Sequence, residues 1–293
     1  MKFQIWGGGG PPRARPFFNC MERYCSENNH ELVVGGRPQA DAIRMTWHGH
    51  REASNHWNVK IGHLESYYTV TKKGYSGWSE VCDEPVDYDA IDDKQADQFH
   101  RELFDKYVSK GNTKYAQPKQ KLNERDYVLM LGQVAGDTVM THCYFPNFKQ
   151  AFTKTIELLH DSCDILIKKH PLAGKQPFLD RLADRCPSVK VADADIHSLI
   201  ERSKGVIVVN SGAGFESLLH LKHVFTLGKC DYQQVTHIVD SEEKIATIPD
   251  TLLTPVQDTK LKKFLLHYST RRCVCTENYE KFQTSLEQVI YPH

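Results

Sequence analysis

The sequence has no excess of charge of either sign, no long apolar run and no even set of cysteines. Its 293 residues include 37 basic and 37 acidic side chains, and this balance gives no electrostatic argument for binding nucleic acid. No stretch approaches the length of a membrane span, and no basic segment followed by a long apolar run opens the chain. We therefore expect no transmembrane segment, no secretion, and a small ligand or a neutral glycan as partner.

Metal-binding patterns are also missing. The nine cysteines are scattered, and the only close pair, Cys273 and Cys275, has neither the spacing nor the partners of a zinc site. The only Asp-x-Asp at an expected strand end, Asp193 and Asp195, reads better as a helix cap. We expect reduced thiols, a cytoplasmic location, and no metal or cofactor.

The first half of the chain alternates short apolar strands with helical segments, which predicts a parallel, doubly wound sheet. A strand over 2–6 runs into the four glycines Gly7–Gly10, which lack the later helix-packing glycine of a dinucleotide fingerprint. Further strands are expected over 31–34 and 42–47. Residues 109–124 are polar and resemble a linker, so the predicted N-terminal domain spans 1–123.

Histidines and aromatic residues gather in expected loops of this first half. The stretch TWHGHREASNHW and the later GYSGW combine imidazoles, indoles and glycines. A His-x-His pair can bind metal, but no carboxylate or cysteine follows at ligand spacing, so we expect a solvated loop or a wall that touches a sugar. Tyr67 and Tyr68 are expected in the same loop-like setting, and half-buried core is the alternative for them. Candidate acceptor contacts are Gly8, Gly9, His48, His50 and Glu65.

The second half repeats the alternation more clearly. Continuous apolar runs predict buried parallel strands, and amphipathic stretches between them predict helices; the strands are expected over 127–132, 165–168, 189–191 and 206–209. This defines a second Rossmann-like domain over 124–275. A helical apolar stripe near the C-terminus predicts a terminal helix, 276–293, that packs back on the first domain.

Polar side chains follow two of these strands. Gln133 and Asp137 come just after the strand over 127–132, and Lys168 and His170 come at the end of the next strand. Open α/β sheets bind their ligands beyond the carboxyl ends of the strands. The cations Lys168 and Lys169, together with the imidazole of His170, would neutralise phosphate well. Solvation of a strand end is the alternative explanation.

The stretch VIVVNSGAGFESLLHLKHVFTLG reads as a buried strand, a tight turn, a helix and a second buried strand. The turn places Asn210 and Ser211 before a helix that opens with Gly212 and Gly214. Free N–H groups at a helix N-terminus bind phosphate, and Glu216, one turn in, can accept hydrogen bonds from ribose hydroxyls. The alternative is an ordinary strand, turn and helix with a first-turn charge.

Three segments, read together, resemble the capsule-polysaccharide Kdo transferases of bacteria, which transfer 3-deoxy-manno-octulosonic acid from its CMP-activated form. They are YVLMLGQVAGDTVM, ILIKKHP, and ADADIHSLI followed by VIVVNSGAGFESLLHLKHVFTLG, in the family's order and with similar spacing. The resemblance covers Tyr127 to Tyr232. It implies a GT-B fold, in which two Rossmann-like doubly wound domains face each other across a cleft.

The resemblance also implies site roles. Lys168 and His170 would face the donor phosphate, Ser211 and the helix beginning at Gly212 would help hold it, and Glu216 would bind the ribose. Gln133, Asn210 and Gly214 complete the predicted donor site.

Asp137 is the only acid in the Gln-Val-x-x-Asp segment, where the family carries the proposed nucleophile of a retaining reaction. The family commonly has further acids just before it, and this chain has Ala135 and Gly136 there. The resemblance nevertheless makes Asp137 and His170 the predicted catalytic residues.

The predicted function is a metal-independent glycosyltransferase that uses CMP-Kdo, with retention, to extend a surface or capsule glycan. One alternative keeps the enzyme class and changes the donor to a UDP- or GDP-linked pentose or hexose. A second is a sugar-nucleotide epimerase of GT-B type, which needs no polymeric acceptor. A third is a glycan- or nucleotide-binding module without catalysis.

Overall fold

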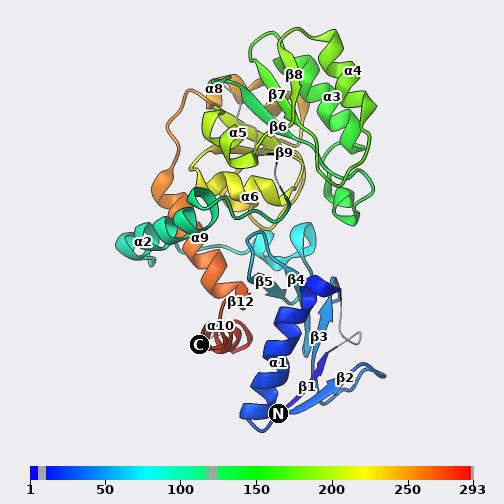
Figure 1. Cartoon of the computed structure of the whole chain (residues 1–293), viewed down its shortest axis with the longest axis vertical. Helices are drawn as coiled ribbons and strands as arrows, with labels where there is room; N and C mark the ends of the chain where they lie inside the picture. The colour runs from blue at the N-terminus through cyan, green and yellow to red at the C-terminus, as the bar shows by residue number, and fades with distance from the viewer. Residues whose placement is uncertain (6–10, 117, 119–123, 292–293) are drawn as a thin grey trace. The chain divides into compact units, whose positions relative to one another are not determined.

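The computed structural model describes residues 1–5, 11–116, 118 and 124–291. The chain divides into two compact units (Figure 1). Unit 1 comprises Met1–Asp92 and Lys263–His293, and unit 2 comprises Asp93–Lys262. Each unit has its own six-stranded sheet, so the expected α/β class with two Rossmann-like parts is confirmed.

The sheet of unit 1 has the order β12-β5-β4-β3-β1-β2. Its strands are β1 (Lys2–Ile5), β2 (Glu31–Val34), β3 (Ile43–Trp47), β4 (His56–Ile61), β5 (Tyr67–Thr71) and β12 (Cys273–Cys275). The pairs among β1, β2, β3 and β4 are parallel, as expected, but β5 runs antiparallel to both β4 and β12. His56 and Trp57, at the end of the stretch expected as a loop, therefore begin a strand, and Tyr67 and Tyr68, expected in a loop-like setting, lie in another, where Tyr68 is buried.

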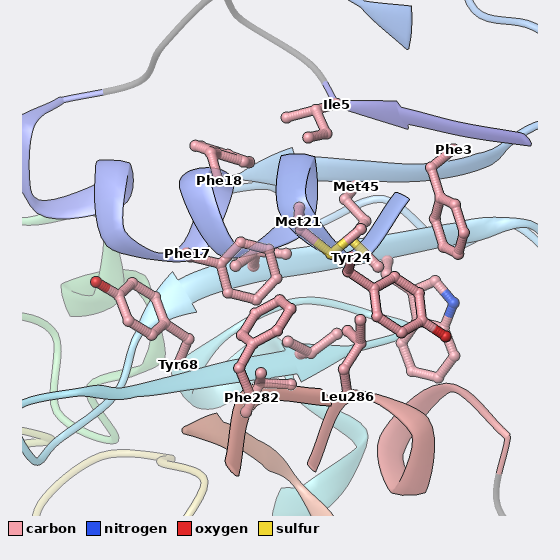
Figure 2. Packing of buried hydrophobic residues seen from close by; sticks show 14 of the residues in the cluster. Phe3, Ile5, Phe17, Phe18, Met21, Tyr24, Met45, Tyr68, Phe282 and Leu286 are labelled. Carbon is pink, nitrogen blue, oxygen red and sulfur yellow. The ribbon is translucent and has the colours of Figure 1, made fainter. Parts of the chain in front are cut away.

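Helices α1 (Arg15–Glu27) and the terminal α10 (Tyr279–Ile290) of unit 1 pack in one hydrophobic core, and the unit also contains the short 3-10 turns η1 (Pro12–Ala14), η2 (Ser76–Trp78) and η3 (Glu80–Cys82). The division between the units falls within α9 (Asp258–Arg271). Figure 2 shows Phe17 of α1 facing Phe282 of α10 and Tyr68 of β5, with ring centroids 5.6 and 5.4 Å away. All three side chains are buried, so α10 is part of this core.

The sheet of unit 2 has the order β8-β7-β6-β9-β10-β11, read from its other edge. Its strands are β6 (Val128–Leu131), β7 (Ile165–Lys168), β8 (Val189–Ala192), β9 (Gly205–Val208), β10 (His223–Thr226) and β11 (His237–Ile238). All the paired strands that the structure describes here run parallel. This is the doubly wound Rossmann order, and the direction of winding reverses between β6 and β9.

Helices cover both faces of this sheet (Figure 1). Val128 and Met130 of β6 point to a core shared with α3 and α4, whereas alternate residues such as Val208 of β9 pack toward α6, as the two-residue period of a strand requires. The helical segments are α2 (Asp93–Leu103), the π-helix η4 (Phe104–Ser109), η5 (Thr138–His142), α3 (Phe148–Leu159), α4 (Pro177–Arg185), α5 (Ile196–Arg202), α6 (Gly212–Leu219), η6 (Gln233–Val235), α7 (Glu242–Ala246) and α8 (Ile248–Thr251).

The units differ from the domains expected at 1–123 and 124–275. Helix α2 and the π-helix belong to unit 2, where the ring of His100 lies 2.9 Å, through Nε2, from the Leu219 carbonyl. At the other end, β12 pairs with β5 in unit 1, with Cys273 opposite Thr69. The polar stretch 109–124 is therefore not the boundary between the units. The boundary comes earlier in the chain, after Asp92.

Candidate functional site

Two buried amides meet at the point where the sheet of unit 2 reverses its winding. Gln133 leaves β6 and Asn210 leaves β9, and the Gln133 Nε2 donates to Asn210 Oδ1 over 2.7 Å. Asn210 Nδ2 in turn donates to the Val139 carbonyl over 2.8 Å, and both side chains are about 5% exposed or less. Open α/β sheets bind ligands at this switch point. Here the two amides hold the strand exits together, because their polar atoms bond to protein groups.

The β7 exit carries a buried cation. Lys168 is 6% exposed, and its Nζ donates to the Ala194 carbonyl over 2.7 Å and lies 3.5 Å from the Asp193 carboxylate. Burial lowers the pKa of Lys168, and the nearby Asp193 opposes that shift. The side chain predicted to face a phosphate therefore ties β7 to the connection between β8 and α5.

His170, two residues further on, has a defined orientation. Its Nδ1 accepts a hydrogen bond from the Leu172 backbone N–H over 3.1 Å, so the neutral ring carries its proton on Nε2. The Tyr115 ring meets it edge-on, with centroids 5.3 Å apart. Burial lowers the pKa of His170, the negative charge of Asp137 opposes the shift, and the positive charge of Lys114 adds to it.

Asp137 begins the 3-10 turn η5 as its cap. One carboxylate oxygen accepts from the Val139 backbone N–H over 3.2 Å, and the side chain is exposed. Its charge acts on the His170 ring. The structure thus brings the two predicted catalytic residues into one neighbourhood, from the exits of β6 and β7.

The turn between β9 and α6 has the predicted form. Ser211 caps α6, with its Oγ 3.4 Å from the Ala213 N–H that donates to it, and Gly212 is the first helical residue. Gly214 serves packing: a Cβ at this position would lie 2.4 Å from the hydroxyl of the buried Tyr232. Gly214 was expected as a donor contact, and its lack of a side chain is needed for the approach of α6 to Tyr232.

Glu216 lies one turn into α6 and is half-buried. Within the part of the chain that the structure describes, no hydrogen bond or ion pair satisfies its carboxylate. Burial raises the pKa of Glu216 to about 7, while the positive charge of Lys114 lowers it and the negative charge of Asp195 raises it. A carboxylate held without a partner near a helix start is available to donors from a ligand.

The predicted cap at Asp195 is confirmed. Its Oδ1 accepts from the Ser198 N–H over 2.9 Å at the start of α5. Across the described residues, no group of three or more His, Cys, Asp or Glu side chains is arranged to hold a metal ion. In the same described ranges, no helix combines the length and apolar character needed to cross a membrane.

The sequence pattern gives no role to Lys114 and Tyr115, because the polar stretch 109–124 resembles a linker. Their charge and ring act on Glu216 and His170. An aromatic residue beside a lysine between Gly111 and Pro118 is the one signal that the sequence offers.

The predicted acceptor residues lie in unit 1. His48 stacks on Trp47 with ring centroids 5.0 Å apart, and His50 stacks on Trp78 at 4.9 Å. His48 has a positive φ of 53°, an uncommon conformation for a residue with a side chain.

Glu65 does not join this group of stacked rings. Glu65 is exposed in the turn between β4 and β5, where its charge acts on Tyr68. Gly8 and Gly9 lie outside the described residues.

Two Rossmann-like units, one with polar side chains gathered at the switch point of its sheet, define a fold of the GT-B class. The model of one protein family, described as capsule polysaccharide biosynthesis protein, matches residues 87–244, more than half of the chain. The chain therefore belongs to this family of capsule polysaccharide biosynthesis proteins.

Solved structures agree on the fold. The beta Kdo 2,7 transferase of Thermosulfurimonas dismutans KpsC aligns over 84% of this chain and 88% of its own, with 14% identity and a TM-score of 0.57. The beta Kdo 2,4 transferase of the same KpsC aligns over 90% and 98%, with 15% identity and a TM-score of 0.53. A search among curated proteins by sequence finds no match. At these identities the likeness establishes the architecture.

Proposed function

We propose that this protein is a glycosyltransferase of capsule polysaccharide synthesis that holds a nucleotide-activated sugar on unit 2. One observation carries the proposal: Asp137, His170, Ser211 and Glu216 all leave the carboxyl edge of the same parallel sheet or lie in the helix that follows it. A nucleotide sugar presents a ribose, a phosphate and an anomeric carbon in series, and this edge offers a group suited to each.

The leaving phosphate needs hydrogen-bond donors, because its negative charge increases as the bond to the sugar breaks. The start of α6 offers the positive end of a helix dipole, and His170 carries a proton on Nε2, away from the Leu172 N–H. Preorganised donors of this kind stabilise a leaving phosphate in the transition state. Glu216 is suited to the ribose, because an unpartnered carboxylate accepts hydrogen bonds from two hydroxyls.

The sugar needs a carboxylate. Asp137 is exposed beside His170, and the proposed reaction is a double displacement. An Asp137 oxygen attacks the anomeric carbon while the bond to the donor phosphate oxygen breaks. The oxygen of an acceptor hydroxyl then bonds to the anomeric carbon as the bond to Asp137 breaks, and its proton passes to the phosphate of the departed nucleotide; the second displacement restores the original configuration. A sequence and fold similar to those of Kdo transferases make CMP-Kdo the first donor to test.

The acceptor is proposed to be a glycan that contacts unit 1. Two imidazoles, His48 and His50, are exposed there against tryptophan rings, and such surfaces pack against sugar rings while offering hydrogen-bond donors. Cytoplasmic location and metal-independent transfer belong to the same proposal.

The test begins with binding. Titration calorimetry with CMP, UDP and GDP identifies the nucleotide, and we expect CMP to bind most tightly; binding of UDP alone would remove Kdo as the sugar. The protein is then incubated with CMP-Kdo and a capsule-type oligosaccharide. Transfer should persist in excess chelator and be lost in Asp137→Asn with nucleotide binding retained.

Matched incubations separate the enzyme classes. If donor alone is converted to an isomeric nucleotide sugar, the protein is an epimerase. Full activity in Asp137→Asn would refute the assigned role of this carboxylate. Glu22→Gln, at an exposed position of α1, is the control for removing one surface carboxylate.

A further inference from the structure

Helix α2 and the π-helix that follows it lead the chain to residues 111–116 of unit 2. Helix α2 is anchored by the contact of His100 with the last turn of α6 at Leu219 and by the ion pair of Lys262 with Asp97, 2.9 Å. The chain continues from α2 directly into the π-helix Phe104–Ser109. Stretches of π-helix are rare and occur frequently at functional sites.

A tight turn then fixes the next residues. Gly111 adopts the left-handed conformation with φ of 65°, which glycine reaches without strain. Asn112 Nδ2 donates to the Lys106 carbonyl over 2.7 Å, and Thr113 Oγ1 donates to the Tyr115 carbonyl over 2.6 Å. The bond between Thr113 and Tyr115 spans Lys114 and orders the backbone on either side of it.

The turn delivers Tyr115 to the exit of β7. Its ring meets His170 edge-on, with planes 73° apart and centroids 5.3 Å apart, a favoured geometry for aromatic pairs. The Leu172 N–H holds Nδ1 of the same imidazole. Two contacts from different parts of the chain thus restrain the ring whose Nε2–H is assigned to the donor phosphate.

Lys114 supplies the positive charge of this region. The charged groups that act on Glu216 are Lys114 and Asp195, with opposite signs, and those that act on His170 are Asp137 and Lys114. Lys114 is the one group common to both sets. Without Lys114, the one charge of this set that acts on the half-buried Glu216 would be the negative charge of Asp195.

We infer that Tyr115 and Lys114 are positioning residues of the donor site: the turn at 111–115 sets the Tyr115 ring against His170 and so holds that ring toward the donor phosphate, and the same turn fixes the backbone of Lys114, whose positive charge acts on the site. This inference rests on the proposed function for its ligand. It adds to the site a segment that precedes the β6 strand.

The first experiment measures nucleotide affinity by calorimetry between pH 6 and 8.5. In the wild type, affinity should rise as Glu216 ionises, with a midpoint near 7. Lys114→Met should move that midpoint up by roughly one pH unit and weaken binding at pH 7 by roughly threefold to tenfold. Lys114→Arg should restore both. Lys110→Met, an exposed lysine at the end of the π-helix, should match the wild type.

The second experiment concerns Tyr115. Tyr115→Ala should lower kcat at saturating donor by roughly tenfold with a small change in nucleotide affinity, whereas Tyr115→Phe, which keeps the ring, should stay near wild type. Equal losses in the Phe and Ala variants would assign the effect to the hydroxyl and overturn the ring contact as its cause.

The third experiment separates this inference from the proposed function, because it needs no ligand. Nuclear magnetic resonance titration of the His170 ring in the free protein should show a higher pKa in Lys114→Met, since a cation that lowers it is removed. If the wild type binds no nucleotide, the proposed function fails while this titration still decides whether Lys114 acts on the site. An unchanged His170 titration with unchanged nucleotide affinity would overturn the inference.

Discussion

Glu216 should make the stability of the free protein depend on pH in a way that one substitution removes. Burial raises the pKa of this carboxyl from its ordinary value of 4.5 to about 7. The folded state therefore holds the proton more tightly than the unfolded chain does. The contribution of Glu216 to the stability of the fold is fully present below pH 4.5. It is lost as the pH rises toward 7, because Glu216 ionises first in the unfolded chain.

The size of the effect follows from the shift. One pKa unit corresponds to about 1.4 kcal/mol, so the raised pKa of Glu216 makes the fold less stable than at low pH by about 3 kcal/mol at pH 8 and by about 1.4 kcal/mol at pH 5.5. Glu216→Gln has similar volume and no charge to bury. We expect this variant to be more stable than the wild type at both pH values, with a gain about 2 kcal/mol larger at pH 8 than at pH 5.5.

Denaturant unfolding of both proteins at pH 5.5 and 8, without nucleotide, measures this difference. The exposed Glu22→Gln variant corrects for the loss of one carboxylate from the chain. A gain that is the same at both pH values would refute the reasoning, since it would mean that Glu216 is not held in a charge-disfavouring site. Addition of the nucleotide should reverse the order, because the carboxylate then gains hydroxyl donors that the amide binds less well.

Further predictions concern the same edge of the sheet. Gly214→Ala places a carbon against the Tyr232 hydroxyl and should cost about 1–3 kcal/mol in denaturant unfolding; Gly136→Ala, whose Cβ meets open space, should not. Alanine at Gln133 or Asn210 leaves a buried amide unpaired and should cost about 1–3 kcal/mol, and strictly additive losses in the double variant would contradict the contact. Lys168→Met frees the Ala194 carbonyl, so amide exchange at the start of α5 should accelerate; unchanged exchange would count against the tether.

Much of unit 2 could be predicted from the sequence, because its strands are buried on both faces and read as continuous apolar runs. Strands β6, β7 and β9 and helix α3 lie where those patterns indicate. Strands β4 and β5 of unit 1 were missed for the opposite reason. They carry histidine, asparagine, lysine and tyrosine, such as Asn58, which is buried and donates to the Arg51 and Lys72 carbonyls. A polar residue satisfied inside the fold looks like a loop residue in the sequence.

The site shows the same limit. Strand ends can be located from periodicity, and parallel strands bring their ends to one edge, so the neighbourhood shared by Asp137 and His170 follows from pattern and topology. The direction of a side chain does not. Lys168 precedes His170 by two residues, yet its ammonium turns to the Ala194 carbonyl, because burial of a cation is costly unless an acceptor is present.

The arrangement also explains why a carboxylate without a partner persists in α6. Gln133, Asn210 and Lys168 satisfy their polar atoms within the protein and therefore fix the strand exits before any ligand arrives. Glu216 has no such bond within the described residues and carries a raised pKa instead. A site that must bind hydroxyls cannot also satisfy its acceptor internally, because the ligand would then have to break that bond. In the proposed donor site, the carboxylate that costs stability in the free protein is thus the acceptor left for the ribose hydroxyls, while the buried amides hold the exits of β6 and β9 together.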